Sequence, residues 1–277
     1  MKKKYRKPLR LAFIVVFLIS TALLIWAMAD NYNGKESYED ALALAKAGEK
    51  TVQTAPVETE PEETEPPREM VWVPEPIEDD PNMEELEQIS LDALREINPD
   101  VLGWIWIPDT AVNYPLMQGE DNQYYLKHTW KNGFNSIGSI FLEYRNTPDM
   151  TDYNTIVYGH NLKSGAMFGG LKRFSKEDYW KAHPYVYVLT DDGIFRYEVF
   201  AAYKADLDSA TYGLSFQQER TRANFLIHAI ESSEIETGII PEKNDRILTL
   251  STCSGSGYTN RWVVQARLKM IEEEKAA

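Results

Sequence analysis

From residue 101 onward, most of the chain divides into short segments that are dense in Val, Ile, Tyr and Trp and separated by turn signals. Eight of these segments read as β-strands: 101–107, 111–117, 137–142, 154–159, 185–190, 194–205, 246–252 and 261–269. Asp191-Asp192-Gly193, between two of them, predicts a tight hairpin turn. Short strands in this number, with few helices between them, predict a mainly β domain whose strands close into a barrel.

Helical patterns flank these strands. Residues 81–98 are expected to form one helix that ends before Pro99, with apolar residues at helical spacing. Its apolar face consists of Met83, Leu86, Ile89, Leu91, Leu94 and Ile97. Two further helical stretches, roughly 165–182 and 215–233, are expected at the periphery of the barrel.

The N-terminus has the charge pattern of a membrane anchor. Residues 1–10 carry six Lys or Arg, and residues 11–29 form an uncharged, apolar run. This run approaches the ~20 residues that span a bilayer, and its basic flank is expected to stay in the cytoplasm. The rest of the chain would then lie outside the cell. The alternative is a cleaved signal peptide, since Ala27-Met28-Ala29 fits a cleavage site, but the apolar core of such a peptide is usually shorter, about 7–15 residues.

Between the anchor and the strands lies an acidic, proline-rich segment. Residues 36–50 read as a short helix just outside the membrane, and 51–81 are rich in Pro, Glu and Thr, a composition typical of an extended spacer. Val71-Trp72-Val73 is an apolar island expected to dock on the domain. The predicted division is an anchor over 1–30, a juxtamembrane helix and stalk over 31–82, and a folded domain over 83–277. The net charge is −14, and the absence of a basic stripe argues against nucleic-acid binding.

Cys253 is the only cysteine and is therefore unavailable for an internal disulfide. It stands at the end of an apolar strand and is followed by the loop Ser254-Gly255-Ser256-Gly257-Tyr258. A lone cysteine in an exported protein suggests a reactive thiol or an intermolecular bridge. A strand end places this cysteine at a rim of the barrel. The alternative is a small buried apolar residue, which is the usual role of an isolated cysteine.

A nucleophilic thiol needs a base and a group that stabilises negative charge. His160 ends a predicted strand, as Cys253 does, whereas His228 lies in a helical pattern, His183 at a helix end and His128 at a surface position. Arg261 follows Cys253 by eight residues and begins the next strand, so a short loop would return it to the same rim. Its guanidinium could stabilise an oxyanion, although a surface arginine is the common alternative.

Together these residues resemble the sortases, specifically class B. The resemblance covers roughly residues 83–270 and rests on several motifs that are weak singly and specific in combination. They are Thr249-Leu250-Ser251-Thr252-Cys253, Arg261 with Val263, Val264, Ala266 and Leu268, Tyr158-Gly159-His160-Asn161 with Met167-Phe168, Asn122-Gln123-Tyr124-Tyr125-Leu126, and Gly138-Ser139-Ile140-Phe141-Leu142.

The resemblance implies an eight-stranded sortase barrel and a transpeptidase that cuts a sorting signal, similar to Asn-Pro-x-Thr-x, after its threonine. It implies that Cys253 is the nucleophile, His160 the general acid/base and Arg261 the oxyanion and substrate clamp. Substrate-binding positions of the family correspond to Asn122, Leu126 and Ser251. Ser254 stands where some relatives have an acid, a departure that bears on substrate preference.

The implied partners are secreted proteins that carry a sorting signal and an amine acceptor, either a peptidoglycan precursor or a pilin lysine. No cofactor is implied, and a single Cys with scattered His lacks the spacing of a zinc site. Two other functions stay open: a non-catalytic, membrane-anchored peptide-binding module, and a hydrolytic cysteine protease. The Cys-Gly-Ser-Cys-Trp signature of papain-type proteases is absent.

Overall fold

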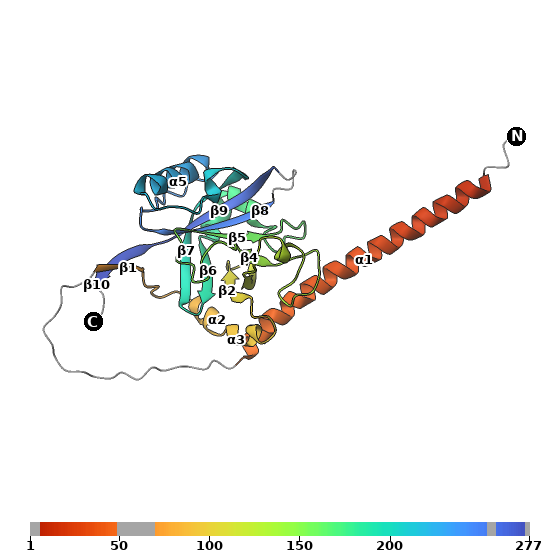
Figure 1. Ribbon diagram of the computed structural model, residues 1–277, viewed down its shortest axis with the longest axis horizontal. Coiled ribbons are helices and arrows are strands. Elements are labelled where there is room, and N and C mark those ends of the chain that lie inside the picture. Colours follow the sequence, from red (N-terminus) through yellow and green to blue (C-terminus); the bar gives the residue numbers. More distant parts are fainter. Residues whose placement is uncertain (1–5, 49–69, 254–258, 275–277) are drawn as a thin grey trace.

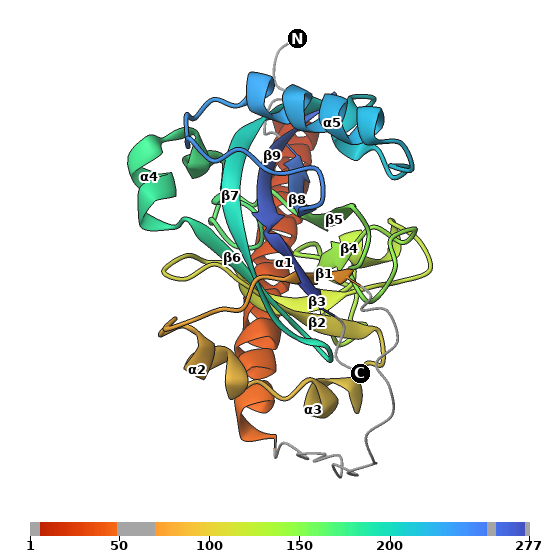
Figure 2. The same ribbon diagram turned by 90° about the vertical axis from the view of Figure 1, so that its left-hand side faces the viewer.

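A computed structural model describes residues 6–48, 70–253 and 259–274. Eight of its strands form a closed barrel in the order β2-β3-β4-β5-β8-β9-β7-β6, seen in Figures 1 and 2. The mainly β fold predicted from the sequence is confirmed. The barrel strands are β2 (Val101–Trp106), β3 (Asn113–Met117), β4 (Ile140–Leu142), β5 (Asn154–Gly159), β6 (Tyr185–Thr190), β7 (Gly193–Asp206), β8 (Arg246–Cys253) and β9 (Asn260–Leu268).

Four neighbouring strands of the barrel are joined by one buried chain of side-chain hydrogen bonds. The Tyr203 hydroxyl of β7 donates to the Gln265 amide oxygen of β9, at 2.9 Å. The Gln265 amide donates to Thr249 Oγ1 of β8, and this hydroxyl donates to Asn154 Oδ1 of β5. All four side chains are buried. A buried polar group without a hydrogen-bond partner destabilises a fold, so a shift in strand register that broke these bonds would be unfavourable. The hydrogen bonds therefore favour a single register for β5, β8, β9 and β7.

The helix of the N-terminus is longer than the sequence predicted. Instead of an apolar span followed by a separate helix over 36–50, α1 (Arg6–Ala47) is continuous for 42 residues. Residues 12–47 include a stretch that is long and apolar enough to cross a membrane. Figure 1 shows the first half of α1 extending away from the barrel and the second half lying against it. No helix-breaking proline separates the two halves, since the only proline of α1 is Pro8.

The helix predicted over 81–98 is divided into α2 (Met83–Glu87) and α3 (Leu91–Arg95). The division occurs because Ser90 adopts an extended conformation and its side chain accepts a hydrogen bond from the Ala93 backbone N–H, as a helix cap does. The apolar face is still buried, with Leu86, Ile89 and Leu94 almost fully enclosed.

Glycines explain two other differences from the predicted elements. The strand expected at 137–142 is only Ile140–Leu142, because Gly138 has φ +63°, which is incompatible with a strand. The helix expected over 165–182 is replaced by a short 3₁₀ turn, η2 (Leu171–Ser175), and α4 (Glu177–Ala182). Gly165, at φ +83°, lies in the part that is not helical. The other expected helix is α5 (Glu219–Ser232).

The apolar island Val71-Trp72-Val73 does dock on the domain. It belongs to β1 (Met70–Pro74), which pairs antiparallel with β10 (Met270–Glu274) near the C-terminus. Further along, Asp80 accepts hydrogen bonds from the Tyr187 hydroxyl at 2.7 Å and from Arg196 at 2.9 Å, which fastens the segment before α2 to the barrel.

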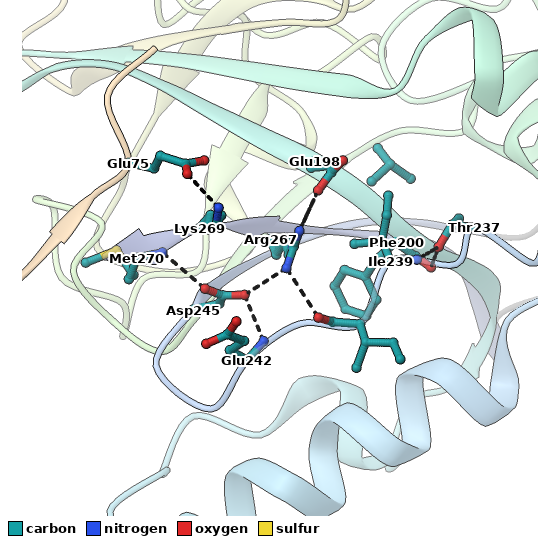
Figure 3. Close-up of polar contacts among 12 residues, drawn as sticks. Glu75, Glu198, Phe200, Thr237, Ile239, Glu242, Asp245, Arg267, Lys269 and Met270 are labelled. Atoms are coloured by element: carbon teal, nitrogen blue, oxygen red, sulfur yellow. Dashed lines mark hydrogen bonds and ion pairs between the residues drawn. The ribbon is translucent and has the colours of Figure 1, made fainter. Parts of the chain in front are cut away.

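Arg267 on β9 connects the start of β8 and the loop that follows α5 (Figure 3). Its Nε and one terminal nitrogen donate to Glu198 of β7, and the other terminal nitrogen donates to the Ile240 carbonyl at 3.2 Å and lies 3.4 Å from Asp245. Asp245 is buried and also accepts hydrogen bonds from the backbone N–H groups of Glu242 and Met270. This cluster holds the base of the β8–β9 pair, at the end opposite Cys253.

Candidate active site

The ends of three adjacent strands bring the predicted catalytic residues to one rim. β8 and β9 pair antiparallel, with Cys253 directly opposite Arg261. β5 and β8 pair parallel, with Gly159 opposite Thr252, so His160 follows Gly159 just as Cys253 follows Thr252. The backbone register therefore brings residues 160, 253 and 261 to neighbouring positions. Residues 254–258, which include Ser254, lie outside the described part of the chain.

His160 is held by a backbone carbonyl from a different segment. Its Nε2 lies 2.6 Å from the carbonyl oxygen of Leu126, in η1 (Tyr124–Leu126). A carbonyl oxygen can only accept, so Nε2 carries the hydrogen of this bond. Gly138 lies against the same edge of the ring, where an added Cβ would lie 2.9 Å from His160 Cδ2, the carbon bonded to Nε2. This hydrogen bond orients the ring, and Nδ1 is the nitrogen that does not take part in it.

A pocket of about 270 Å³ opens beside this rim. Two of the three predicted substrate-binding residues line it, Asn122 and Leu126. The third, Ser251, is fully buried and is not among the described lining residues, but its hydroxyl lies 2.9 Å from the hydroxyl of Tyr212, which does line the pocket. The described lining is Asn122, Gln123, Leu126, Phe141, Glu143, Arg145, Tyr158, Gly159, His160, Leu207, Tyr212 and Arg261.

A buried carboxylate, Glu143, lies in the wall of this pocket and was not predicted from the sequence. It accepts hydrogen bonds from the Asn122 amide at 2.6 Å, the Tyr158 hydroxyl at 3.0 Å and Arg145 Nε at 2.6 Å. Burial raises the pKa of Glu143, but these donors outweigh burial and leave the pKa below its ordinary value. The only sequence signal is its position directly after the apolar segment 140–142, which does not reveal that it is buried.

Tyr158 connects this carboxylate to the arginine. Its hydroxyl donates to Glu143, and the Arg261 guanidinium carbon lies 5.7 Å from the centre of its ring. Burial and the neighbouring Glu143 carboxylate raise the pKa of Tyr158, so the phenol stays protonated at neutral pH. A guanidinium over an aromatic face is a favourable arrangement. It keeps a cation at the rim, beside the ring of Tyr158.

The other three histidines have structural surroundings. His128 stacks on Tyr124 with ring centres 3.9 Å apart, and its Nδ1 lies 2.8 Å from the Tyr124 carbonyl. His183 ends α4, with its Nδ1 3.1 Å from the Pro108 carbonyl. His228 Nε2 lies 3.4 Å from Thr211 Oγ1. Within residues 6–48, 70–253 and 259–274, no group of three or more His, Cys, Asp or Glu is arranged to hold a metal ion.

Comparisons with known proteins agree with this geometry. The family model of the sortase domain matches residues 105–269. The chain is 38% identical over 180 residues to sortase B of Listeria monocytogenes, covering 63% of this chain and 72% of that protein. It is 32% identical over 179 residues to sortase B of Staphylococcus aureus, covering 64% and 73%.

Solved structures with the same fold are also sortases B. The Staphylococcus aureus sortase B–substrate complex superposes with a TM-score of 0.62 at 32% identity, covering 68% of this chain and 86% of that one. Sortase B from B. anthracis in complex with AAEK1 gives a TM-score of 0.65 at 29% identity, covering 87% and 98%. The chain described here therefore belongs to the sortase family, and within it to class B.

Proposed function

We propose that this sortase cleaves a sorting signal, similar to Asn-Pro-x-Thr-x, after its threonine and transfers the acyl group to an amine, with Cys253 as nucleophile, His160 as general acid/base and Arg261 as oxyanion stabiliser. The observation that carries the proposal is the backbone register, with Cys253 opposite Arg261 on β9 and His160 one residue past the β5 partner of Thr252. The three residues stand at or directly after the ends of three neighbouring strands, and a pocket of about 270 Å³ that His160 and Arg261 line supports the proposal.

In the first step, the Cys253 thiolate attacks the threonine carbonyl carbon, and the carbonyl electrons move onto oxygen. Arg261 donates hydrogen bonds to this oxyanion. Such electrostatic stabilisation lowers the barrier because the negative charge develops in the transition state. His160 gives its proton to the departing amine nitrogen as the C–N bond breaks, which leaves a thioester on Cys253.

In the second step, an acceptor amine attacks the thioester and loses a proton to His160, and the C–S bond breaks to restore the thiolate. Since Nε2 of His160 donates to the Leu126 carbonyl, Nδ1 is the nitrogen that exchanges protons in both steps. A sortase B structure that resembles this one, with a TM-score of 0.61 at 31% identity, is a complex with triglycine. This supports an amine acceptor such as a peptidoglycan precursor, with a pilin lysine as the alternative.

We further propose that Asn122 and Leu126 contact the sorting signal directly, because both line the pocket. Asn122 is already oriented, since its amide donates to Glu143 and its oxygen accepts the Tyr144 backbone N–H. Ser251 would act at one remove, through its contact with Tyr212.

The same proposal includes a single-pass anchor over residues 1–30, with the N-terminus in the cytoplasm and the catalytic domain, 83–277, outside the cell. The basic residues that precede the apolar half of α1 support this orientation. The intervening residues 31–82 would connect the two parts, as a juxtamembrane helix and a Pro/Glu/Thr-rich segment.

The test uses the full chain in detergent with a fluorogenic sorting peptide. Cys253→Ala is expected to abolish cleavage and the thioacyl adduct seen by intact-protein mass spectrometry. His160→Gln is expected to lower kcat/KM by about 10²- to 10⁴-fold, whereas the matched control His228→Gln should retain wild-type turnover. Undiminished cleavage by Cys253→Ala would end the proposal.

Two outcomes would instead support the other functions. Peptide binding without turnover by the wild-type chain would indicate a binding module. Hydrolysis at the same rate and with the same products, whether or not triglycine is present, would indicate a cysteine protease. The transpeptidase requires a new amide product that appears only with the amine.

A further inference from the structure

The second half of α1 is docked on the domain through a stripe that begins at a sharp boundary. The apolar residues 13–19 and 23–26 are exposed, with exposed fractions of 46–69%. From Asp30 onward, residues at helical spacing face the domain, and Tyr38, Ala41 and Ala45 are buried. The exposed apolar part of α1 thus ends, and the part that packs against the domain begins, within about one turn of Ala29, the last residue of the apolar run.

The contacts follow the helix in order and give the direction of the domain relative to the anchor. The Asn135 amide donates to the Asp30 carbonyl at 2.7 Å, and the Ser136 backbone N–H donates to the Asp30 carboxylate. Further from the anchor, Trp130 donates to the Ser37 carbonyl at 2.7 Å, and Lys131 pairs with Asp40 at 3.0 Å.

At the far end of the docked half, the Ser90 backbone N–H donates to the Ala45 carbonyl and Lys46 pairs with Glu85. At about 1.5 Å per residue, Lys46 lies about 24 Å along the helix from Asp30. Of these contacts, those of Asn135 and Ser136, in the segment 133–136, lie nearest the apolar run, and those near α2 and α3 lie farthest from it. Figure 1 agrees, with α2 and α3 at the end of α1 that lies away from the N-terminus.

An exposed aromatic residue lies in this nearest segment. Phe134 is adjacent to Asn135 in the sequence and is 67% exposed. Its ring and the His128 ring make a T-shaped contact with centres 5.7 Å apart, and His128 stacks on Tyr124, which is 41% exposed. The contact with His128 holds one side of the Phe134 ring in place. The rest of the ring is not covered by any of the described residues.

From these contacts we propose that residues 133–136 rest on the outer face of the membrane, with Phe134 in the headgroup region. This inference relies on the anchor and orientation proposed above. If residues 11–29 cross the bilayer, their ~28 Å of helix nearly fills its ~30 Å core, and Asp30 then stands at its outer edge. Asn135 and Ser136 bond to that same residue. Trp and Tyr are the aromatic residues enriched at this depth. The exposed apolar ring of Phe134 would leave water there, which is favourable.

The proposal has a consequence for substrate access. The short turn η1 contains both Tyr124, on which His128 stacks, and Leu126, whose carbonyl oxygen accepts the hydrogen bond from His160. A domain with the membrane contact at residue 134 and a rigid helix at Asp30 cannot rotate freely around its anchor. The pocket then has a fixed orientation relative to the bilayer, which favours substrates that are themselves held in the membrane.

The first experiment measures the position of Phe134 directly. The full chain carrying Cys253→Ala, which removes the native thiol, receives Phe134→Cys, is labelled with the fluorophore NBD and is reconstituted in vesicles that contain lipids with a headgroup nitroxide. The NBD emission at position 134 is expected to shift to the blue and to be quenched by the nitroxide. The matched control is Gln88→Cys, exposed at the end of α2, whose label should be neither shifted nor quenched.

A label at Ile19→Cys separates this inference from the proposed anchor. If the label at position 19 is shielded by lipid and the label at position 134 behaves like that at position 88, the membrane contact is wrong although the anchor holds. If neither position 19 nor 134 senses lipid, the anchor itself fails. A blue shift at 134 that depends on the protein-to-lipid ratio, without nitroxide quenching, would assign the surface to a second copy of the chain and overturn the proposal.

The second experiment measures function with the same sorting signal in two forms, as a soluble peptide and attached to a transmembrane segment in the same vesicles. Phe134→Ser is expected to lower turnover of the membrane-held substrate several-fold and to leave the soluble peptide unchanged, while Phe134→Trp should restore it. The control Ile227→Ser, an exposed apolar residue on α5, should affect neither substrate. An equal loss with both substrates, or no loss with either, would contradict the proposal.

Discussion

His160 Nε2 lies 2.6 Å from the carbonyl oxygen of Leu126. This contact selects one tautomer of the neutral ring, because only a nitrogen that carries hydrogen can bond to a carbonyl. We expect His160 to carry its hydrogen on Nε2 when neutral, with Nδ1 bare. The measurement is ¹⁵N NMR of the full chain labelled at histidine, with each signal assigned by a single His→Gln substitution.

His128 is the internal control for this measurement. Its Nδ1, not its Nε2, faces a carbonyl, that of Tyr124 at 2.8 Å, so its neutral ring should show the opposite tautomer. A spectrum in which His160 has a bare Nε2 would contradict the assigned proton path, even if His160 proved essential.

Gly138→Ala is expected to displace the His160 ring and to destabilise the fold around it. Gly138 has φ +63°, which costs a residue with a Cβ about 1 kcal/mol. The added Cβ would also lie 2.9 Å from His160 Cδ2 and 2.9 Å from the Leu126 carbonyl oxygen, so it would push apart the two groups that share the orienting hydrogen bond. We expect a large fall in kcat together with a loss of stability greater than the strain of the positive φ alone would cause.

The control for the strain alone is Gly238→Ala. Gly238 has φ +73°, but no atom of the described residues lies within 4 Å of the position of its added Cβ. Thermal unfolding should show the smaller loss for Gly238→Ala, because the Cβ at Gly138 would also lie 2.8 Å from the Tyr125 carbonyl oxygen. Cleavage of the sorting peptide by the folded protein should fall only for Gly138→Ala. Full activity in Gly138→Ala would show that the His160 ring tolerates displacement.

The sequence predicted the barrel because its strands carry their own signal. The segments around β5, β8 and β9 are apolar, β-branched and bounded by turns, so their positions and the rim that they share followed from local pattern. Elements whose form depends on tertiary contacts were predicted less well. Ser90 caps α3 and so interrupts a segment with a continuous helical pattern. The helix α1 continues through residues 30–35 because the domain buries one face of it, and local sequence does not reveal that contact.

The candidate site was likewise predicted in part. His160 and Arg261 stand at strand ends, and pairing between strands brings them to Cys253, as the sequence analysis expected. Glu143 and the Leu126 carbonyl could not be found in this way. The role of Glu143 depends on burial and on three donors from separate segments, and a backbone carbonyl has no residue type that marks it.

Glu143 is expected to make stability depend on pH. Its pKa is held below the ordinary value, about 4.3, by donors that outweigh the effect of burial. Its contribution to the free energy of unfolding is therefore fully present above the pKa of the unfolded state and is lost as the pH falls through the lower pKa of the folded state. The difference in stability between the wild-type chain and Glu143→Gln should be greatest at neutral pH and should shrink below about pH 4.3.

Urea unfolding between pH 3 and 7 measures this difference. Glu219→Gln is the matched control, because Glu219 also has a lowered pKa, owing to Lys243, but is an exposed residue. Solvent and salt screen such an exposed pair. In about 0.2 M salt, where the Debye length is below about 10 Å, the stability of Glu219→Gln should equal that of the wild type at all pH values. A stability difference for Glu143→Gln that is independent of pH would mean that lost packing, not lost charge, is responsible.

Arg267→Met is expected to destabilise the fold without affecting catalysis. The substitution leaves Asp245, which is buried, without its cationic partner, and removes the two donors to Glu198 and one to the Ile240 carbonyl (Figure 3). Leaving a buried carboxylate with fewer partners costs about 2 kcal/mol or more.

Lys269→Met is the control, since the Lys269–Glu75 pair nearby is largely exposed and such pairs contribute about 0–1 kcal/mol. Thermal unfolding should separate the two variants, and kcat per folded molecule should match the wild type in both because the cluster lies at the opposite end of β8 from Cys253. Equal stability of the two variants would show that Arg267 adds no more than a surface ion pair.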